Sequence, residues 1–283
     1  MAVKLVIDSS SDITEKEAQE LGVAMLPMAI TFGEEEFFDG VTLLQEEFYN
    51  RLVKSSELPK TSQVNAFRFG EEFAKHVQNG DEVVAIVLSS QLSGTYHSAL
   101  QAAEDYNGKV FVVDSLNATA GGKILVEYAV RLQKEGKSAK EIFETLEEKK
   151  KKIQVRAMID TLKFLKKGGR VSPFVAFAGE LMGIKPLAAV VDGKVEVVGK
   201  TIGLKKAIGQ MNKDIQKLGG IDFDMPFYVL YSGNKEEIAD KYIQDNVELW
   251  ECGVENVRKD CMGATIGTHV GPGAIGVAFF AKD

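Results

Sequence analysis

The strongest constraint on the fold is an apolar run that ends abruptly in hydroxyl-bearing residues. Residues 83–88 are apolar and mostly β-branched, and the sequence Ser-Ser-Gln-Leu-Ser-Gly-Thr follows directly at residues 89–95. Helical spacing of apolar side chains then begins at Tyr96. This order predicts a buried strand, a tight turn and a helix whose first turn has free backbone N–H groups. Because the N-terminus of a helix carries a partial positive charge, hydroxyls beside it favour a carboxylate or a phosphate as ligand.

Strands and helices alternate in this way throughout the first half of the chain. The predicted strands cover residues 3–7, 24–32, 83–88 and 110–113. Helices are predicted near residues 66–78, 96–103, 117–135 and 138–149. Capping-box spacing predicts two additional helix starts, at Thr14 with Glu17 and at Thr42 with Gln45. The same spacing, at Ser138 with Glu141, marks the start of the helix at 138–149. This alternation predicts a parallel α/β sheet.

The second half of the chain has a different pattern. Asp192-Gly193 lies between the apolar runs 186–191 and 194–198, which is a strong signal for a β-hairpin. A helix near 204–218, a strand at 227–231, a helix near 235–251 and strands near 255–260 and 274–281 follow. We therefore predict an α/β protein of two domains. Residues 1–155 form an N-terminal Rossmann-like domain with a parallel sheet, residues 156–283 form a C-terminal α+β domain with a mixed sheet, and the ligand lies in the cleft between them.

The charge of the chain argues against nucleic acid as a partner. The net charge is −7. Residues 1–152 carry 17 Lys and Arg against 25 Asp and Glu, a net −8, and residues 153–283 carry 17 against 16, a net +1. Neither half has the basic stripe that binding to a phosphate backbone requires.

The cysteines, the histidines and the hydropathy of the chain argue against a disulfide-rich, metal-binding, secreted or membrane-spanning protein. Cys252 and Cys261 are too few for a disulfide framework, and neither they nor the three histidines have metal-ligand spacing. The N-terminus lacks the basic region and apolar core of a signal peptide, and no apolar run approaches the ~20 residues of a membrane span. We expect a cytoplasmic protein that does not span a membrane and has no metal or cofactor.

Hydroxyl and acidic side chains gather where several predicted strands or loops end. Ligands of open α/β sheets bind at the carboxyl ends of strands, so these hydroxyls would form a site rich in hydrogen-bond donors. We expect Thr61, Ser62 and Ser93 to bind a ligand. Gly94 would let that ligand approach the backbone closely. Helix capping is the alternative role, and we favour it for the serines after the first and the last of the four predicted strands.

Ser93 also has an enzymatic interpretation, because a strand, a turn, a serine and a helix form the nucleophile elbow of hydrolases. That elbow requires Gly-x-Ser-x-Gly, whereas residues 91–95 read Gln-Leu-Ser-Gly-Thr. His269 lies in the glycine-flanked segment 267–273, where it can reach a site and hold a water or an anion, or be a buried structural residue. A serine esterase or acyl hydrolase that uses Ser93 and His269 is therefore the alternative function.

Arg170 follows two glycines in the segment Lys-Lys-Gly-Gly-Arg-Val-Ser-Pro, residues 166–173. Its guanidinium group has the shape to bind a carboxylate or a phosphate, although an ion pair between domains is the alternative. The order of residues differs from a P-loop, so an ATP site is not indicated.

The segment after Arg170, residues 173–184, is apolar on nearly every side of a helix. Such a helix is either buried in the core or lines an apolar cavity. The candidates for the wall of an apolar tunnel are Phe174, Phe177, Ala178, Leu181 and Met182.

Taken together, these segments resemble the DegV family of bacterial fatty-acid-binding proteins. The resemblance runs from end to end of the chain, and the order and spacing of the segments make it specific. The matching segments are residues 6–12, 60–63, 89–96, 113–115, 167–172, 184–186 with 192–194, and 267–273.

The resemblance implies two α/β domains that clasp one long-chain fatty acid, in a protein that is not itself an enzyme. The carboxylate would meet the hydroxyls of Thr61 and Ser93. Arg170 and His269 match the positions that support the head group, in part through water. The better-studied members present the acyl carboxylate to a separate fatty acid kinase, which makes an acyl-phosphate for phospholipid synthesis.

One segment departs from the family pattern. Many relatives carry arginines just before a Lys-Lys-Ala that opens a helix, whereas Ile202 and Leu204 stand before Lys205-Lys206-Ala207 here. If those arginines help to dock the kinase, a lipid sensor without a kinase partner becomes a third possible function.

Overall fold

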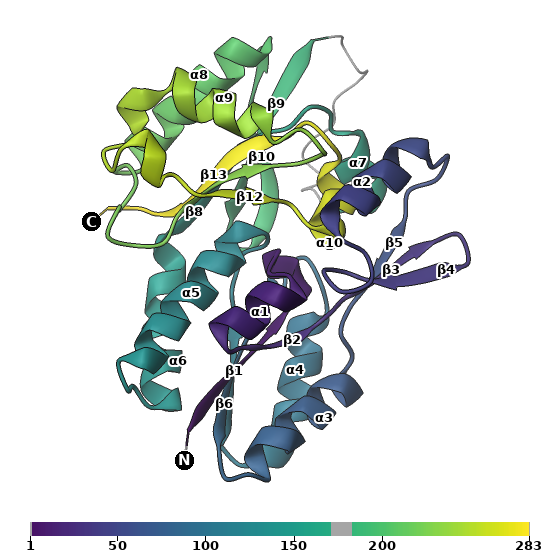
Figure 1. Cartoon of the computed structure of the whole chain (residues 1–283), viewed down its shortest axis with the longest axis vertical. Coiled ribbons are helices and arrows are strands. Elements are labelled where there is room, and N and C mark those ends of the chain that lie inside the picture. Colours follow the sequence, from purple (N-terminus) through teal and green to yellow (C-terminus); the bar gives the residue numbers. More distant parts are fainter. Residues whose placement is uncertain (1, 171–182, 283) are drawn as a thin grey trace.

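The computed structural model describes residues 2–170 and 183–282 of the chain (Figure 1). Its strands are β1 Val3–Asp8, β2 Ala24–Leu26, β3 Ala29–Phe32, β4 Glu35–Phe38, β5 Lys60–Ser62, β6 Glu82–Val87, β7 Val110–Asp114, β8 Ile153–Met158, β9 Ile184–Val191, β10 Lys194–Ile202, β11 Tyr228–Tyr231, β12 Lys259–Cys261 and β13 Ile275–Phe280. Its α-helices are α1 Glu15–Leu21, α2 Gln45–Lys54, α3 Ala66–Val77, α4 Thr95–Ala103, α5 Ala120–Lys134, α6 Ala139–Lys149, α7 Lys163–Gly168, α8 Leu204–Lys217, α9 Glu237–Asp245 and α10 Ala264–Val270.

A four-stranded parallel sheet, in the order β2-β1-β6-β7, forms from the first half of the chain. Helices cover both of its faces, with α5 and α6 on one side and α3 and α4 on the other (Figure 1). Strand β6 is apolar at every position after the first because helices cover both of its sides. Val84 and Ile86 face α5 and α6, and Val83, Ala85 and Val87 face α3 and α4.

A six-stranded mixed sheet, in the order β10-β9-β8-β13-β11-β12, forms from the second half. Strands β9 and β10 make the predicted hairpin, whose turn residues Asp192 and Gly193 both have positive φ, at 47° and 79°. This is the backbone that a two-residue hairpin turn requires. The predicted α/β fold, with a parallel sheet first and a mixed sheet second, is confirmed.

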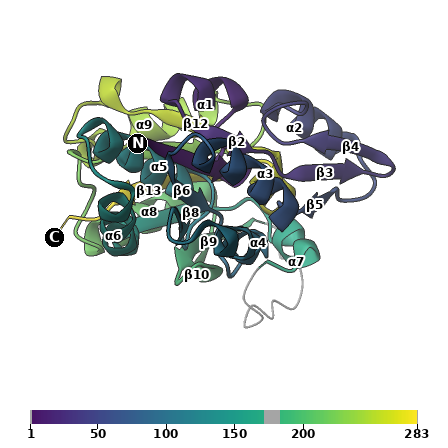
Figure 2. The same cartoon turned by 90° about the horizontal axis from the view of Figure 1, so that it is seen from below.

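Helix α5 joins the two sheets. One apolar cluster contains α5 residues such as Ile124 and Val126, strand β1 of the parallel sheet, and Val155 and Ala278 of the mixed sheet. The far side of the mixed sheet packs on α8 and α9 (Figure 1). A smaller sheet, β4-β3-β5, lies beside α2 at one end of the molecule (Figure 2). The shared core fixes the parallel sheet against the mixed sheet.

Four predictions about single elements need correction, and two of them concern the region before α2. The strand predicted over 24–32 is two strands, β2 and β3, which belong to different sheets. Pro27 lies between them, and it has no N–H to continue a ladder. The predicted capping box at Thr42 does not form, because α2 begins only at Gln45 and the Thr42 hydroxyl accepts a hydrogen bond from the Phe38 N–H at 2.8 Å. The capping boxes at Thr14 and Ser138 are confirmed.

The third correction concerns the long helix predicted from residue 117. It begins at Ala120, because Leu116 and Thr119 adopt positive φ values of 50° and 52°. The helix predicted to reach residue 251 ends at Asp245. Strand β8 and helix α10 were not predicted. Within the described residues, no helix combines the length and the apolar character needed to cross a bilayer.

Candidate functional site

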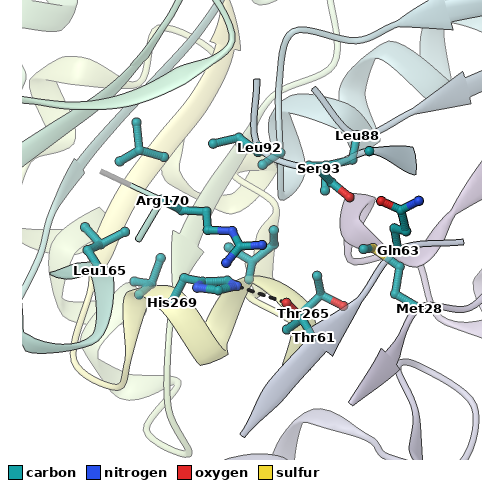
Figure 3. Close-up of a pocket in the computed structure, with 15 residues that line it drawn as sticks. Met28, Thr61, Gln63, Leu88, Leu92, Ser93, Leu165, Arg170, Thr265 and His269 are labelled. Carbon is teal, nitrogen blue, oxygen red and sulfur yellow. Dashed lines mark hydrogen bonds between the residues drawn. The ribbon is translucent and has the colours of Figure 1, made fainter. Parts of the chain in front are cut away.

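One pocket brings together residues from both halves of the chain (Figure 3). It has a volume of about 190 Å³. Five of the predicted site residues line it: Thr61, Ser93, Gly94, Arg170 and His269. The pocket lies where the turn before α4 meets strand β5, α7 and α10, so the fold gathers side chains as distant in sequence as Thr61 and His269, which are 208 residues apart.

Strand β5 presents Thr61 to this pocket. It pairs with β3 in an antiparallel register that sets Thr61 opposite Ile30, a fully buried core residue. Successive side chains of a strand point to opposite faces. Ser62, the next residue, is accordingly exposed and does not line the pocket. The two neighbouring hydroxyls of this strand therefore have different surroundings.

Ser93 lies in the turn between β6 and α4. Its Oγ accepts a hydrogen bond from the Thr95 N–H at 3.3 Å and lies 3.0 Å from the Thr95 hydroxyl. Gly94 lets the side chain of Gln63 lie close to the backbone of the turn, since a Cβ on residue 94 would lie 2.1 Å from Oε1 of Gln63. Gln63 in turn donates to the Ser98 hydroxyl at 3.1 Å. Gln63 thus links the strand that carries Thr61 to the helix that follows Ser93.

His269 comes from the last turn of α10, a seven-residue helix held at its start by two buried aspartates. Asp39 accepts hydrogen bonds from the backbone N–H groups of Ala264, at 2.9 Å, and Thr265, at 3.1 Å. Asp12 accepts one from the Gly263 N–H at 2.9 Å. These carboxylates satisfy the free N–H groups of the first turn and so fix the helix that carries His269.

The His269 ring is neutral at pH 7. Burial lowers its pKa to about 4, and the positive charge of Arg170 lowers it in the same direction. Its Nε2 lies 3.2 Å from the Thr61 hydroxyl oxygen, as the dashed line in Figure 3 marks.

The hydrogen bonds of Thr61 and Ser93 define what ligand the pocket accepts. When Nε2 of His269 carries the ring proton, it donates to Thr61 and leaves the Thr61 hydroxyl proton free for a ligand. When the Thr95 hydroxyl donates to Ser93, the Ser93 hydroxyl proton is likewise free for a ligand. Two hydroxyl donors beside the Arg170 charge suit a group that only accepts hydrogen bonds and is negatively charged, such as a carboxylate.

Apolar side chains make up the rest of the lining. They come from loops, helices and a strand of both halves and include Met28, Leu88, Leu92, Leu165, Val195 and Ile266. The predicted tunnel residues Phe174, Phe177, Ala178, Leu181 and Met182 lie outside the described residues. The described residues by themselves give the pocket an apolar surface and a polar end formed by Thr61, Ser93, Arg170 and His269.

Arg170 lies just after the end of α7. Its Nη1 donates to the Gly168 carbonyl at 2.7 Å, and the side chain is exposed at the pocket. Two further polar lining residues, Gln63 and Thr265, were not predicted. Gln63 could have been found as the third polar residue of the segment 61–63. Thr265 gave no local signal, because α10 itself was not predicted.

Among the described residues, no hydrogen bond joins Ser93 to His269. The His269 ring is paired with Thr61, while Ser93 is paired with Thr95. A nucleophilic serine requires a base within hydrogen-bond reach. In the part of the chain that the structure describes, no group of three or more His, Cys, Asp or Glu side chains could hold a metal ion.

We expect the His269 ring of the ligand-free protein to titrate near pH 4 rather than near the ordinary 6.5. Between these values the folded protein binds fewer protons than the unfolded chain, so His269 reduces stability as the pH falls from 6.5 to 4. A bound carboxylate should raise this pKa, because an anion favours the imidazolium. NMR titration, with the resonance assigned through His269→Gln, measures the pKa of His269 with and without the ligand. Titration near 6.5 without ligand would contradict the geometry.

The chain is similar to proteins of one family over nearly its whole length. A family model described as an uncharacterised protein of the DegV family matches residues 2–282. A DegV domain-containing protein from Caldanaerobacter subterraneus is 35% identical over 282 residues, and one from Deinococcus radiodurans is 32% identical over 282 residues. The alignment covers 99% of both chains in the first case and 98% of both in the second.

Two solved structures are similar over their full length. One, described as fatty acid binding of a DegV family protein from Thermus thermophilus, superposes with a TM-score of 0.88 at 31% identity. The other, DegV from Bacillus subtilis, described as a fatty acid binding protein, has a TM-score of 0.82 at 29% identity. In both cases 100% of each chain is covered.

Proposed function

The chain belongs to the DegV family, and we propose on this basis that its pocket binds one long-chain fatty acid, with the carboxylate held by Thr61 and Ser93. The observation that carries the proposal is the pairing of two hydroxyl donors with an apolar wall in a single pocket. His269 supports Thr61, and Arg170 adds a positive charge at the same end.

The magnitudes support a division of roles between tail and head group. Burial of an acyl chain contributes about 0.8 kcal/mol per CH₂, or roughly 12 kcal/mol gross for a chain of ~16 carbons. Ordering of the chain and loss of free motion offset several kcal/mol of this. A hydrogen bond to a charged group contributes about 1.5–3 kcal/mol. The tail therefore supplies most of the affinity, and the hydroxyls select the end that bears the carboxylate.

Thr61→Val tests the head-group contact with little change of shape. We expect it to raise the Kd for a long-chain fatty acid by about 10- to 100-fold, because one hydrogen bond to a charged group is lost. Ser62→Ala is the matched control on the same strand and should leave the Kd unchanged, because Ser62 does not line the pocket. Displacement of a fluorescent fatty acid gives both values. Equal effects of the two substitutions would exclude Thr61 as a carboxylate ligand.

The identity of the ligand can be read from the protein itself. A lipid held by a buried tail should remain bound through purification, so organic extraction followed by mass spectrometry is expected to release a fatty acid in a near one-to-one ratio. Extraction of no acyl compound, together with no binding of added fatty acids, would contradict the proposal.

The next step proposed for the ligand is transfer to a fatty acid kinase. Ile202 and Leu204, which stand where many relatives carry arginines, are 72% and 42% exposed, so both side chains are accessible to a partner protein. A pull-down with a fatty acid kinase, with and without lipid, tests the partnership. Lipid-dependent capture supports presentation to the kinase, and lipid binding without capture favours a sensor.

We also propose that residues 1–155 and 156–283 are the two domains that clasp the ligand; the boundary between them lies within strand β8, which belongs to the mixed sheet. Thr61 and Ser93 come from the first segment and His269 from the second, so the head-group site draws on both. The shared core around α5 makes the two segments stable together.

A further inference from the structure

Helices α7 and α10 pack closely where two glycines face aromatic rings: Gly168 of α7 faces His269, and Gly271, just after α10, faces Phe164. A Cβ on Gly168 of α7 would lie 2.1 Å from Nδ1 of His269 and 3.0 Å from its Cε1. A Cβ on Gly271, just after α10, would lie 2.2 Å from Cδ2 of Phe164. Real Cβ atoms do not approach other atoms this closely, so neither glycine can gain a side chain unless the facing ring moves.

This packing determines the surroundings of the two nitrogens of His269. Nδ1 is buried and has no hydrogen-bond partner among the described residues, and it lies beside the Cα of Gly168. Nε2, on the other side of the ring, lies 3.2 Å from the Thr61 hydroxyl. A neutral imidazole has one donor and one acceptor nitrogen. A proton on Nδ1 would be a buried donor without an acceptor, which proteins rarely tolerate, whereas a proton on Nε2 has Thr61 as its acceptor.

We propose that Gly168 is a positioning residue: the missing side chain lets the His269 ring lie against α7 and so keeps its proton on Nε2, directed at Thr61. The inference rests on the proposed function: with its proton on Nε2, His269 donates to Thr61 and does not compete with the carboxylate for the Thr61 hydroxyl proton. Gly168 does not contact the ligand in this account. It acts through His269, and the turn that it begins also carries Arg170, whose Nη1 donates to the Gly168 carbonyl at 2.7 Å.

Gly168→Ala is the direct test. The added methyl group should push the ring from its place, expose Nδ1 and raise the Kd for a long-chain fatty acid by about tenfold, comparable to the loss of one hydrogen bond to a charged group. Nitrogen-15 NMR of the imidazole should show the Nε2–H tautomer in the wild-type protein and a mixture of tautomers in the variant. The NMR readout is independent of stability, so a purely structural role for Gly168 would not move it.

Gly169→Asn is the matched control in the same turn. Gly169 has a φ of 65°, and a Cβ added to it would have no other atom within 4 Å. Asparagine accepts this backbone conformation more readily than most residues. The substitution should leave both the Kd and the tautomer unchanged. In a His269→Ala background, Gly168→Ala should change the Kd less than about twofold, because the residue on which it acts is absent.

Each outcome is decisive. An Nδ1–H tautomer in the wild-type protein overturns the inference even if Gly168→Ala fails to fold. An unchanged Kd and tautomer in Gly168→Ala, or the same loss of affinity in the His269→Ala background, also overturns it. If the wild-type protein shows the Nε2–H tautomer but binds no fatty acid, the proposed function fails while the role of Gly168 in orienting the ring stands.

Discussion

Replacing Lys123 with methionine is expected to lower the free energy of unfolding by about 3–5 kcal/mol, because it leaves a buried carboxylate without its cation. The Lys123 side chain is 4% exposed. Its ammonium group binds Glu17 of α1 at 2.8 Å and Asp260 of β12 at 2.9 Å. It therefore joins α5 to elements from both halves of the chain, and methionine cannot replace either contact.

The loss should depend on pH, and its direction follows from Asp260. Burial raises the pKa of Asp260 to about 7, while the nearby Lys123 ammonium lowers it. Without Lys123 this pKa rises further, so the folded variant binds a proton that the unfolded chain, with a pKa near 3.8, does not. Protonation relieves the unpaired charge. The destabilisation should therefore be smaller at about pH 5 than at about pH 8, when both are measured by urea unfolding.

Lys16→Met is the matched control for this substitution. Lys16 forms a surface pair with Glu20 at 3.9 Å, and its side chain is 86% exposed. Such a pair contributes little, so the control should change stability by less than about 0.5 kcal/mol. A Lys123→Met protein as stable as Lys16→Met would show that the buried ion pairs do not hold the two halves together.

Asp39→Ala is expected to cost about 3 kcal/mol of stability and to weaken fatty acid binding as well. Asp39 is 2% exposed and accepts hydrogen bonds from the N–H groups of Ala264 and Thr265 and from the Ser9 hydroxyl at 3.3 Å. Each buried donor left unpaired costs about 1–3 kcal/mol. Burial raises the pKa of Asp39, so removal of the charge offsets part of this loss, but three donors remain unsatisfied. Because α10 carries His269, its displacement should reach the pocket.

Ser138→Ala provides the comparison, since Ser138 also caps a helix but lies on the surface, at the start of α6. Loss of this cap should cost about 1 kcal/mol and leave fatty acid affinity unchanged. Urea unfolding and displacement of a fluorescent fatty acid measure the two effects. If Asp39→Ala lost stability but retained full affinity, α10 would not position the head-group site.

The elements of the fold that depend on residues close together in the sequence were predictable. The hairpin at Asp192-Gly193 and the capping boxes at Thr14 and Ser138 depend on residues within a few positions of one another. Strand β8 could also have been found, because Ile153–Met158 largely alternates apolar and polar side chains. It was missed because it follows a helix and a lysine run without a turn signal.

Helix α10 could not be predicted from its own residues. Gly263, Gly267 and Gly271 lie within or beside it, and glycine is among the poorest helix formers. What holds α10 is the pair of carboxylates of Asp12 and Asp39, which lie 251 and 225 residues away in sequence from the groups that they bind. The pairing of His269 with Thr61 depends on that helix. Sequence reasoning therefore predicted five residues that line the pocket, but not the contacts that organise them.

A crystal structure of the protein with a bound long-chain fatty acid tests the central claim most directly. We predict that one carboxylate oxygen lies within hydrogen-bond distance of the Thr61 hydroxyl and the other within that distance of the Ser93 hydroxyl, with the alkyl chain against Leu92 and Ile266. A carboxylate directed away from both hydroxyls, or a fatty acid bound elsewhere while this pocket holds only water, would contradict the account.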